Sequence, residues 1–331
     1  MYEIDPPVPG FVFSAGYYIV AAITLLAINI MMQVSSNRSA DSNNATDELK
    51  NTQNELPIQG GLELGTYLFF GNCLQVVGLE SVPADRAAFE VQLTTVIVPF
   101  LQVAIGGNQF GGVTSKTWLA TVLAFLGVLT MGMEGKGSEA GDVVASAADT
   151  SVSHIMGTMS LQSGDVLIFL AALAYSFHVI RLGRYAPTTS ALRLAAAKAS
   201  TEAVFSIALI AWLMTFGQST SFGQEVTSFF SAFQNGGISS QTIVPAVGSC
   251  LWTGWVTCAY TIYAQSYGQR SVSPSDANLV YASQPIFSSL FAYILLGEVL
   301  GTYGYIGGAL IAAAVLLITS QEPEGLKNGN E

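Results

Sequence analysis

The sequence has little charge. Of its 331 residues only 10% are Asp, Glu, Lys or Arg, whereas 51% are apolar and the mean hydropathy is +0.49. A water-soluble domain of this composition would leave a large apolar surface exposed to water. The scarcity of charge therefore excludes an ordinary soluble domain and indicates a chain that lies in lipid.

Basic residues and histidine are scarce as well. With 11 Lys and Arg against 22 Asp and Glu, the net charge is -11 at pH 7, which leaves no basic face for nucleic-acid phosphates. The two histidines, His154 and His178, are too few for a usual zinc site, and Gly135-Lys136 lacks the rest of a phosphate-binding loop. We therefore expect no nucleic-acid partner, no metal, no cofactor and no enzymatic activity.

Long apolar runs are abundant. An α-helix needs about 20 apolar residues to cross a hydrocarbon core of about 30 Å. Runs of this kind recur along the chain, and they are continuously apolar rather than alternating, which favours helices over the strands of a barrel. We predict an all-α membrane protein with nine transmembrane helices in the lipid bilayer. They cover residues 11–33, 62–79, 87–105, 117–133, 164–180, 203–217, 242–267, 277–297 and 302–320.

The basic residues fall unevenly on the two sides that these helices define. Lys and Arg gather in cytoplasmic segments, so the side that carries more of them is expected to be the cytoplasm. Nine of the eleven lie on one side, and only Arg86 and Lys136 lie on the other. This predicts a multi-pass protein with a cytoplasmic C-terminus. The nine are Arg38, Lys50, Lys116, Arg181, Arg184, Arg193, Lys198, Arg270 and Lys327, and we place the four from Arg181 to Lys198 in one loop.

The chain contains a weak internal repeat. Residues 83–85 (Pro-Ala-Asp) align with residues 274–276 (Pro-Ser-Asp) at an offset of 191 residues. Equivalent helices are five apart in order, so each crosses the membrane in the opposite direction to its partner. We predict two inverted repeats of a five-helix unit. The repeats are residues 1–133, with four helices and no opening helix, and 164–320, with five; a flexible linker at 134–163 and a cytoplasmic tail at 321–331 complete the chain.

Several segments carry a family resemblance. Residues 283–287, 296–298 and 305–311 resemble the closing part of a repeat unit of the drug/metabolite transporter superfamily, whose repeats are EamA-type domains. Residues 164–167 look like the opening of the same unit. The resemblance implies ten helices in two inverted repeats around a central cavity. This chain departs from it in lacking the first helix, and in having Gly107 where the second half has Glu298.

The third predicted helix carries an ionisable face. Arg86, Glu90 and Thr94 follow one another at intervals of four residues and share one side of a helix. Charged side chains within a membrane-spanning segment are costly and often functional. Two interpretations stay open: Arg86 and Glu90 form an ion pair at the membrane rim, or Glu90 binds a proton or the cationic part of a substrate.

The eighth predicted helix has a polar stripe that a proline interrupts. Asn278, Tyr281 and Pro285 lie along one face, and the equivalent third helix has its own Pro99. Interrupted helices at corresponding positions of two repeats indicate a binding site near the middle of the membrane, although simple kinked packing would give the same pattern.

Other polar and aromatic residues complete the candidates. In the seventh helix Tyr260, Tyr263 and Tyr267 share a face, where their rings stack on a flat organic substrate or serve as an interfacial belt. Asn72 and Gln75 of the second helix are weaker candidates. The predicted substrate-binding residues are Asn72, Gln75, Glu90, Thr94, Tyr260, Tyr263, Asn278, Tyr281 and Gln284.

Two classes of function fit this pattern. The first is a secondary transporter that moves a small polar organic metabolite by alternating access without ATP hydrolysis. The second is a membrane scaffold without transport activity, or a truncated fragment that needs a partner helix.

Glycines at positions 297, 301, 304 and 308 have the spacing of close helix packing or of a homodimer face, and we expect packing within the chain.

Overall fold

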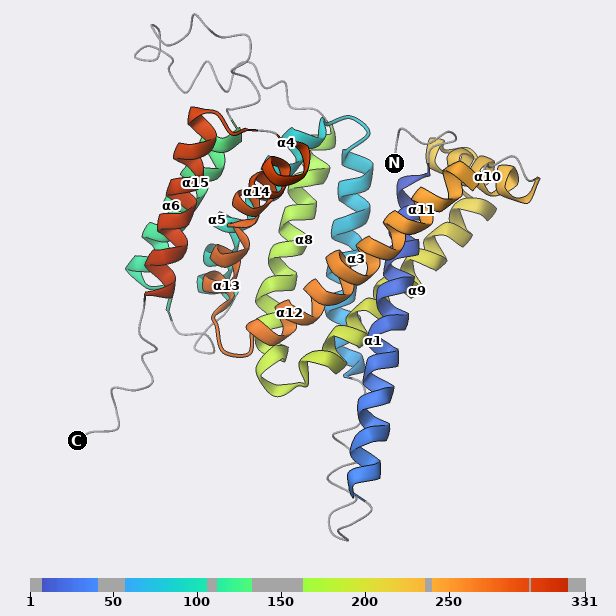
Figure 1. Cartoon of the computed structure of the whole chain (residues 1–331), viewed down its shortest axis with the longest axis horizontal. Coiled ribbons are helices and arrows are strands. Elements are labelled where there is room, and N and C mark those ends of the chain that lie inside the picture. Colours follow the sequence, from blue (N-terminus) through green and yellow to red (C-terminus); the bar gives the residue numbers. More distant parts are fainter. Residues whose placement is uncertain are drawn as a thin grey trace, which may run out of the picture. The chain divides into compact units, whose positions relative to one another are not determined.

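The computed structural model describes residues 8–40, 57–105, 112–132, 163–235, 240–297 and 299–320, and within these ranges all regular structure is helical (Figure 1). Several sequence predictions lie outside them. These are the linker from 134 to 162, the C-terminal tail, Lys136, His154, Gly107 and Glu298.

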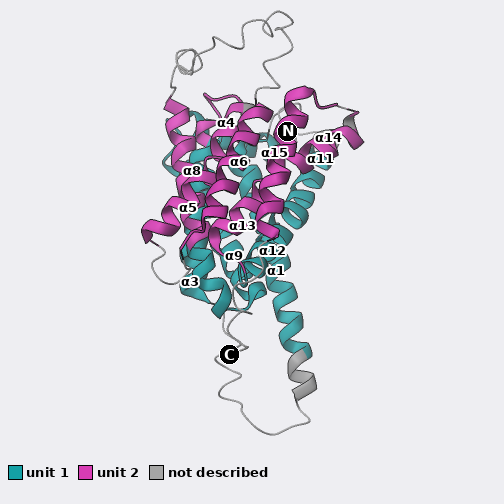
Figure 2. Cartoon of the chain, turned by 90° about the vertical axis from the view of Figure 1, so that its left-hand side faces the viewer, with its two compact units in different colours: residues 1–76, 181–271 teal, residues 77–180, 272–331 magenta. Residues whose placement is uncertain are grey.

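The chain divides into two compact units (Figure 2). Unit 1 comprises residues 1–76 and 181–271, and unit 2 comprises residues 77–180 and 272–331. Helices α3 (Ile58–Gly78) and α8 (Ser163–Tyr185) each contribute residues to both units.

Unit 1 is built on small residues that let helices approach closely. Helix α1 (Gly10–Ala40) packs along α9 (Ala191–Thr215) and the π-helical segment η4 (Thr253–Tyr260). The shared core contains Ala21 and Leu25 of α1, a row of alanines of α9 and Ala259 of η4. A Cβ atom at Gly254 would lie against Val20, so the glycine permits the close approach of η4 to α1.

The remaining helices of unit 1 extend this core. Helix α11 (Ser240–Trp252) precedes η4, and α12 (Thr261–Gly268) continues it and packs on α9. Helix α10 (Ser221–Gln234), which the apolar runs did not predict, is amphipathic and packs on α9. Its first turn is capped by Thr220, whose Oγ1 accepts a hydrogen bond from the Gly223 amide at 3.1 Å. A short 3-10 turn, η3 (Ala186–Thr188), links α8 to α9.

In unit 2 the main contact joins α6 (Ser115–Gly132) to α15 (Thr302–Thr319) (Figure 1). Gly127 and Gly307 meet backbone to backbone, because a Cβ atom on either would collide with the carbonyl oxygen of the other. Gly308, one position further along α15, faces open space. Thus Gly307 makes this close contact, although the spacing of glycines along the sequence pointed to Gly308.

Two helical runs of unit 2 are broken at comparable places. Helix α4 (Ala84–Val91) has eight residues and is separated from α5 (Thr94–Ile105) by two, and α13 (Pro274–Tyr281) has eight and is separated from α14 (Gln284–Leu296) by two. Pro285 follows the second break directly, and its ring excludes continuous helix there. Pro99 instead lies inside α5, well past the first break.

Helices cover most of each predicted run, and seven helical segments of the described ranges are long and apolar enough to cross a membrane. Those segments leave out α3 and the run formed by α13 and α14. The count of nine membrane crossings stays a prediction. The largest difference from prediction is in α9, which begins at Ala191 rather than near 203. Arg193 and Lys198 therefore lie within a helix and not in a loop, and Arg181 and Arg184 belong to α8.

Candidate functional site

The broken helices of unit 2 are joined by buried amide side chains. The Asn278 amide on α13 donates a hydrogen bond from Nδ2 to the backbone carbonyl of Thr94, 3.0 Å away, at the first residue of α5. Gln102, further along α5, accepts at Oε1 from the backbone N–H and the hydroxyl of Ser275, at 2.9 and 2.7 Å. These bonds fix α5 against α13, and the backbone around the breaks gains polar partners.

Asp276 gives α13 a second set of bonds. Its carboxylate accepts from the hydroxyl of Ser273 at 2.8 Å and from that of Thr117, the third residue of α6, at 3.2 Å. Ser273 Oγ in turn accepts from the Asp276 amide and caps α13. The beginning of this broken helix is therefore attached to α6 as well as to α5.

Arg86 contacts two carboxylates of unit 2. Its Nε donates to Glu90 Oε1 at 3.2 Å along α4, and its Nη2 donates to Asp165 Oδ2 at 2.5 Å on α8. The Asp165 side chain is only 4% exposed. Sequence reasoning treated Arg86 and Glu90 as a pair and missed Asp165, which lies far away in the chain.

The other predicted residues of unit 2 have different surroundings. Tyr281 packs against the apolar cluster of Val98, Val179 and Ile180. The Gln284 side chain is exposed at the start of α14. Of the predicted residues in this unit, the structure thus brings Thr94 and Asn278 into direct contact and leaves Gln284 apart from them.

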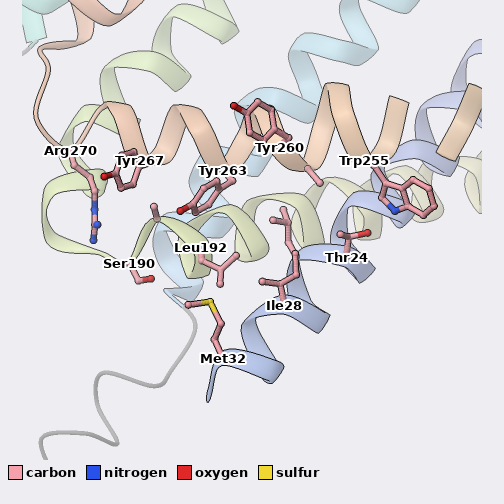
Figure 3. Close-up of a pocket in the computed structure, with 13 residues that line it drawn as sticks. Thr24, Ile28, Met32, Ser190, Leu192, Trp255, Tyr260, Tyr263, Tyr267 and Arg270 are labelled. Carbon is pink, nitrogen blue, oxygen red and sulfur yellow. The ribbon is translucent and has the colours of Figure 1, made fainter. Parts of the chain in front are cut away.

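Unit 1 contains an elongated groove of about 400 Å³ (Figure 3). Arg270 and Ser190 lie at one end of it, and Trp255 and Thr24 lie at the other. The rings of Tyr263 and Tyr267 stack with centroids 6.2 Å apart and planes inclined by 28°. The remaining lining residues are Leu25, Ile28, Met32, Ala191, Leu192, Ala259 and Tyr260.

The groove has one charged end and an aromatic wall. Arg270 donates from Nη2 to the backbone carbonyl of Thr189 at 2.9 Å, which holds the guanidinium beside the α8–α9 connection. Tyr263 is 37% exposed and Tyr260 is 67% exposed, so both rings offer free surface. Such a surface can stack on a flat organic molecule while Arg270 faces a negative or polar group.

Asn72 of α3 belongs to a small polar cluster in the same unit. Its Nδ2 donates to Ser14 Oγ and to the Tyr17 hydroxyl, both at 3.3 Å and both on α1. Gln75, one turn further along α3, is half-buried. Asn72 therefore has protein partners in this structure, and any ligand that binds it would replace them.

A charged cluster that the sequence reasoning missed ties α3 to α8. Arg181 donates from Nε and Nη2 to the two carboxylate oxygens of Glu63, and the Tyr185 hydroxyl donates to Glu63 Oε2 at 2.6 Å. This two-pronged contact is the strongest geometry available to an arginine and a carboxylate. The contact is partly exposed and joins the second turn of α3 to the last turns of α8.

The second missed feature is a buried pair of opposite charges on α9. Lys198 and Glu202 lie one turn apart, and their side chains are 0% and 1% exposed. Their signal in the sequence is a lysine and a glutamate four residues apart in a run of alanines. By contrast, the part of the chain that the structure describes has no cluster of three or more His, Cys, Asp or Glu side chains that could hold a metal ion.

Comparisons with known proteins agree with a membrane-transport fold. Residues 162–320 match the EamA-like transporter family. An uncharacterized transporter of Archaeoglobus fulgidus is 21% identical over 262 residues, which cover 79% of this chain and 69% of that protein. A permease-like protein of Bacillus subtilis, YdzE, is 30% identical over 78 residues, 24% of this chain and 100% of that protein. A solved structure with 13% identity shares the fold, with a TM-score of 0.62 over 94% of this chain and 88% of that one.

Proposed function

This chain belongs to the EamA-like transporter family, and we propose that it moves a small polar organic metabolite across a membrane by alternating access, without ATP hydrolysis. The proposal includes nine transmembrane helices in two inverted repeats, divided at 1–133 and 164–320, with the C-terminus in the cytoplasm. The observation that carries it is the pair of broken helical runs in unit 2.

The two breaks occupy corresponding positions of the proposed repeats. The residues between α4 and α5 are 92 and 93, and those between α13 and α14 are 282 and 283, an offset of 190 residues. The aligned sequences differ by 191, so the breaks correspond to within one residue. Broken helices at matching positions of two inverted halves are a common way to build a substrate site in the middle of a membrane.

The polar contacts between these helices support a site that can rearrange. Thr94 directly follows the first break, Asn278 lies one turn before the second, and the Asn278 amide donates a hydrogen bond to the Thr94 backbone carbonyl. A polar substrate can take over the Asn278 amide while the two helices separate on one side of the membrane. Movement of the corresponding helices of the other repeat then opens the other side, because inverted halves can trade conformations.

We propose substrate contacts in both units. In unit 2 they come from Glu90, Thr94, Asn278, Tyr281 and Gln284, and in unit 1 from Asn72, Gln75, Tyr260 and Tyr263. The direct bond between Thr94 and Asn278 supports the first set. The stacked aromatic wall of the groove supports the second, because base- or ring-bearing metabolites bind such walls (Figure 3).

Exchange of labelled metabolites in liposomes tests this function. Purified protein is reconstituted with an unlabelled polar metabolite extract inside, and uptake of the same extract carrying ¹³C is followed by mass spectrometry. We expect saturable uptake of at least one metabolite that an internal pool of the same compound accelerates. Asn278→Ala should slow it at least tenfold, whereas Val280→Ala, on the same helix and 42% exposed, should leave it unchanged.

Two results would count against the proposal. If no metabolite shows saturable exchange with folded wild-type protein, the chain is better described as a scaffold or as a fragment that needs a partner helix. If Asn278→Ala and Val280→Ala behave alike, transport stands but the broken helices do not hold the substrate.

A further inference from the structure

Lys198 and Glu202 lie deep inside α9. At about 1.5 Å per residue, Lys198 is about 10 Å and Glu202 about 16 Å from the start of a helix about 37 Å long. Both side chains are buried, at 0% and 1% exposure. If α9 spans the bilayer, as its length and composition allow, the carboxylate of Glu202 lies near the middle of the hydrocarbon core.

Apolar residues flank this pair along α9. The neighbouring alanines of α9 belong to the apolar core that this helix shares with α1 and η4. Glu202 interacts electrostatically with Lys198 on its own helix, Tyr17 on α1 and Cys258 on η4. The other groups packed around this stretch are Tyr18 of α1, Ile262 of α12, and α3 at Gly61 and Gly65, where backbone and not a charged side chain meets α9.

The carboxylate of Glu202 has no hydrogen-bond donor in this arrangement. Neither Oε1 nor Oε2 accepts a hydrogen bond from any residue that the structure describes. A buried carboxylate normally needs several donors to offset the loss of water, and a positive charge one turn away supplies only part of that stabilisation. The Glu202 carboxylate is therefore expected to change its protonation state when its surroundings change.

Charge balance indicates what accompanies such a change. As a lysine cation and a glutamate anion, the pair is neutral. When Glu202 takes up a proton, the pair gains a net positive charge inside the membrane, and an anionic group beside Lys198 would restore neutrality. Proton binding at Glu202 and anion binding at Lys198 must then favour each other by the same factor.

We propose that Glu202 and Lys198 form a proton-coupled binding site for an organic anion, a metabolite with a carboxylate or phosphate group. This rests on the proposed transport function and assigns its coupling ion. One proton from water on one side converts the Glu202 carboxylate to a carboxylic acid, and Lys198 pairs with the anion. On the other side the anion leaves, the proton returns to water and Lys198 pairs with Glu202 again, so no other bond is made or broken.

The groove of unit 1 provides a route toward this pair. Leu25 and Ala259 line the groove and also belong to the apolar core shared by α1, α9 and η4. The groove and the apolar core that contains the alanines next to Lys198 and Glu202 therefore share these two side chains. Arg270 at one end of the groove is positively charged and suits the entry of an anion.

Infrared difference spectroscopy during a pH titration tests proton binding without any substrate. The carbonyl stretch of a protonated carboxylic acid should appear as pH falls in the wild type and in Glu225→Gln, which removes an exposed carboxylate of α10 in the same unit. Glu202→Gln should lose one such band, and Glu202→Asp should shift its frequency. A spectrum that is the same in wild type, Glu202→Gln and Glu202→Asp overturns the proposal.

A transport assay distinguishes failure of this proposal from failure of the proposed transport function. The ¹³C-labelled extract is divided into anionic and non-anionic fractions by anion exchange and offered to liposomes with and without an imposed pH gradient. We expect the gradient to raise accumulation of an anionic metabolite at least fivefold in wild type and Glu225→Gln. In Glu202→Gln the gradient should raise this accumulation less than twofold, while exchange at equal pH on the two sides continues.

The outcomes are distinct. Exchange that no pH gradient accelerates, or acceleration that survives in Glu202→Gln, overturns the proton coupling and leaves the transport function standing. Gradient-driven accumulation of non-anionic compounds alone overturns the role of Lys198. Absence of exchange in folded wild type removes the function on which the proposal rests.

Discussion

The contact between α5 and α13 in unit 2 and helix α9 in unit 1 both contain buried polar side chains, but the hydrogen bonding of these side chains differs. Between α5 and α13 of unit 2, Gln102, Ser275 and Asn278 have hydrogen-bond partners at 2.7 to 3.0 Å. On α9 of unit 1, the Glu202 carboxylate accepts no hydrogen bond from the described residues. Satisfied groups stabilise one arrangement of helices, whereas an unsatisfied charge favours a change that brings it a partner.

The largest expected effect comes from breaking the charged pair of unit 1. Lys198→Ala leaves the buried Glu202 carboxylate without its positive neighbour, which should destabilise the protein by about 3 to 5 kcal/mol. The double variant Lys198→Leu with Glu202→Leu should recover most of this, because two apolar side chains need no partners there. Thermal unfolding in detergent micelles measures both.

If the double variant is as unstable as Lys198→Ala, the pair is a structural element and the contrast between the units fails. Retention of wild-type stability by Lys198→Ala would likewise show that Glu202 does not depend on the lysine.

A smaller loss of stability is expected when the close contact between α6 and α15 of unit 2 is disturbed. Gly307→Ala places a Cβ atom against the Gly127 carbonyl and Met131, and should destabilise the α6–α15 contact by about 1 to 3 kcal/mol. Gly308→Ala, which meets nothing within 4 Å, is the matched control and should be neutral. Equal melting temperatures for the two variants would contradict the assigned packing.

The hydrogen bonds of unit 2 are expected to contribute less. Gln102→Leu removes the acceptor of two bonds and leaves the Ser275 N–H and hydroxyl without their partner, at a cost of about 2 kcal/mol. Gln284→Leu changes an exposed glutamine of α14 and should lower stability by less than about 0.5 kcal/mol. If the unfolding curves of the two variants coincide, the hydrogen bonds between Gln102 and Ser275 do not hold α5 to α13.

Substitutions in the groove of unit 1 should change the stability of the protein least. Tyr263→Ala loses one stacked ring pair on a partly exposed surface, about 1 kcal/mol, and Tyr260→Ala should lose less because that ring is 67% exposed. Their stability is again read from thermal unfolding. A larger loss for Tyr260→Ala than for Tyr263→Ala would show that the stacked pair is not the important part of the wall.

The course of the helices could be predicted well from the sequence, because a continuous apolar run of about 20 residues has few alternatives in lipid. Helix α10, which is amphipathic, and the first half of α9 were the exceptions. Lys198 and Glu202 made residues 191–202 look like a polar flank, and the predicted helix therefore began at 203. A charge that is buried by a partner helix cannot be distinguished from an exposed one in a single sequence.

The helix breaks show a second limit of sequence patterns. Pro285 marks the break between α13 and α14 directly, because it lacks an amide N–H and its ring blocks the preceding turn. The break before α5 has no proline beside it, and Pro99 lies inside the helix. Contacts between distant residues, such as Arg86 with Asp165 or Gln102 with Ser275, depend on tertiary packing that no local spacing encodes.

Alternating access at the broken helices is the central claim, and cysteine labelling from each side of the membrane tests it most directly. Thr94→Cys, in a protein whose Cys73, Cys250 and Cys258 are replaced by serine, keeps the backbone carbonyl that Asn278 binds. A membrane-impermeant maleimide is applied separately to inside-out and right-side-out vesicles. The account predicts labelling from both sides, and protection on both sides by a transported metabolite. Labelling from one side only, or from neither, would contradict it.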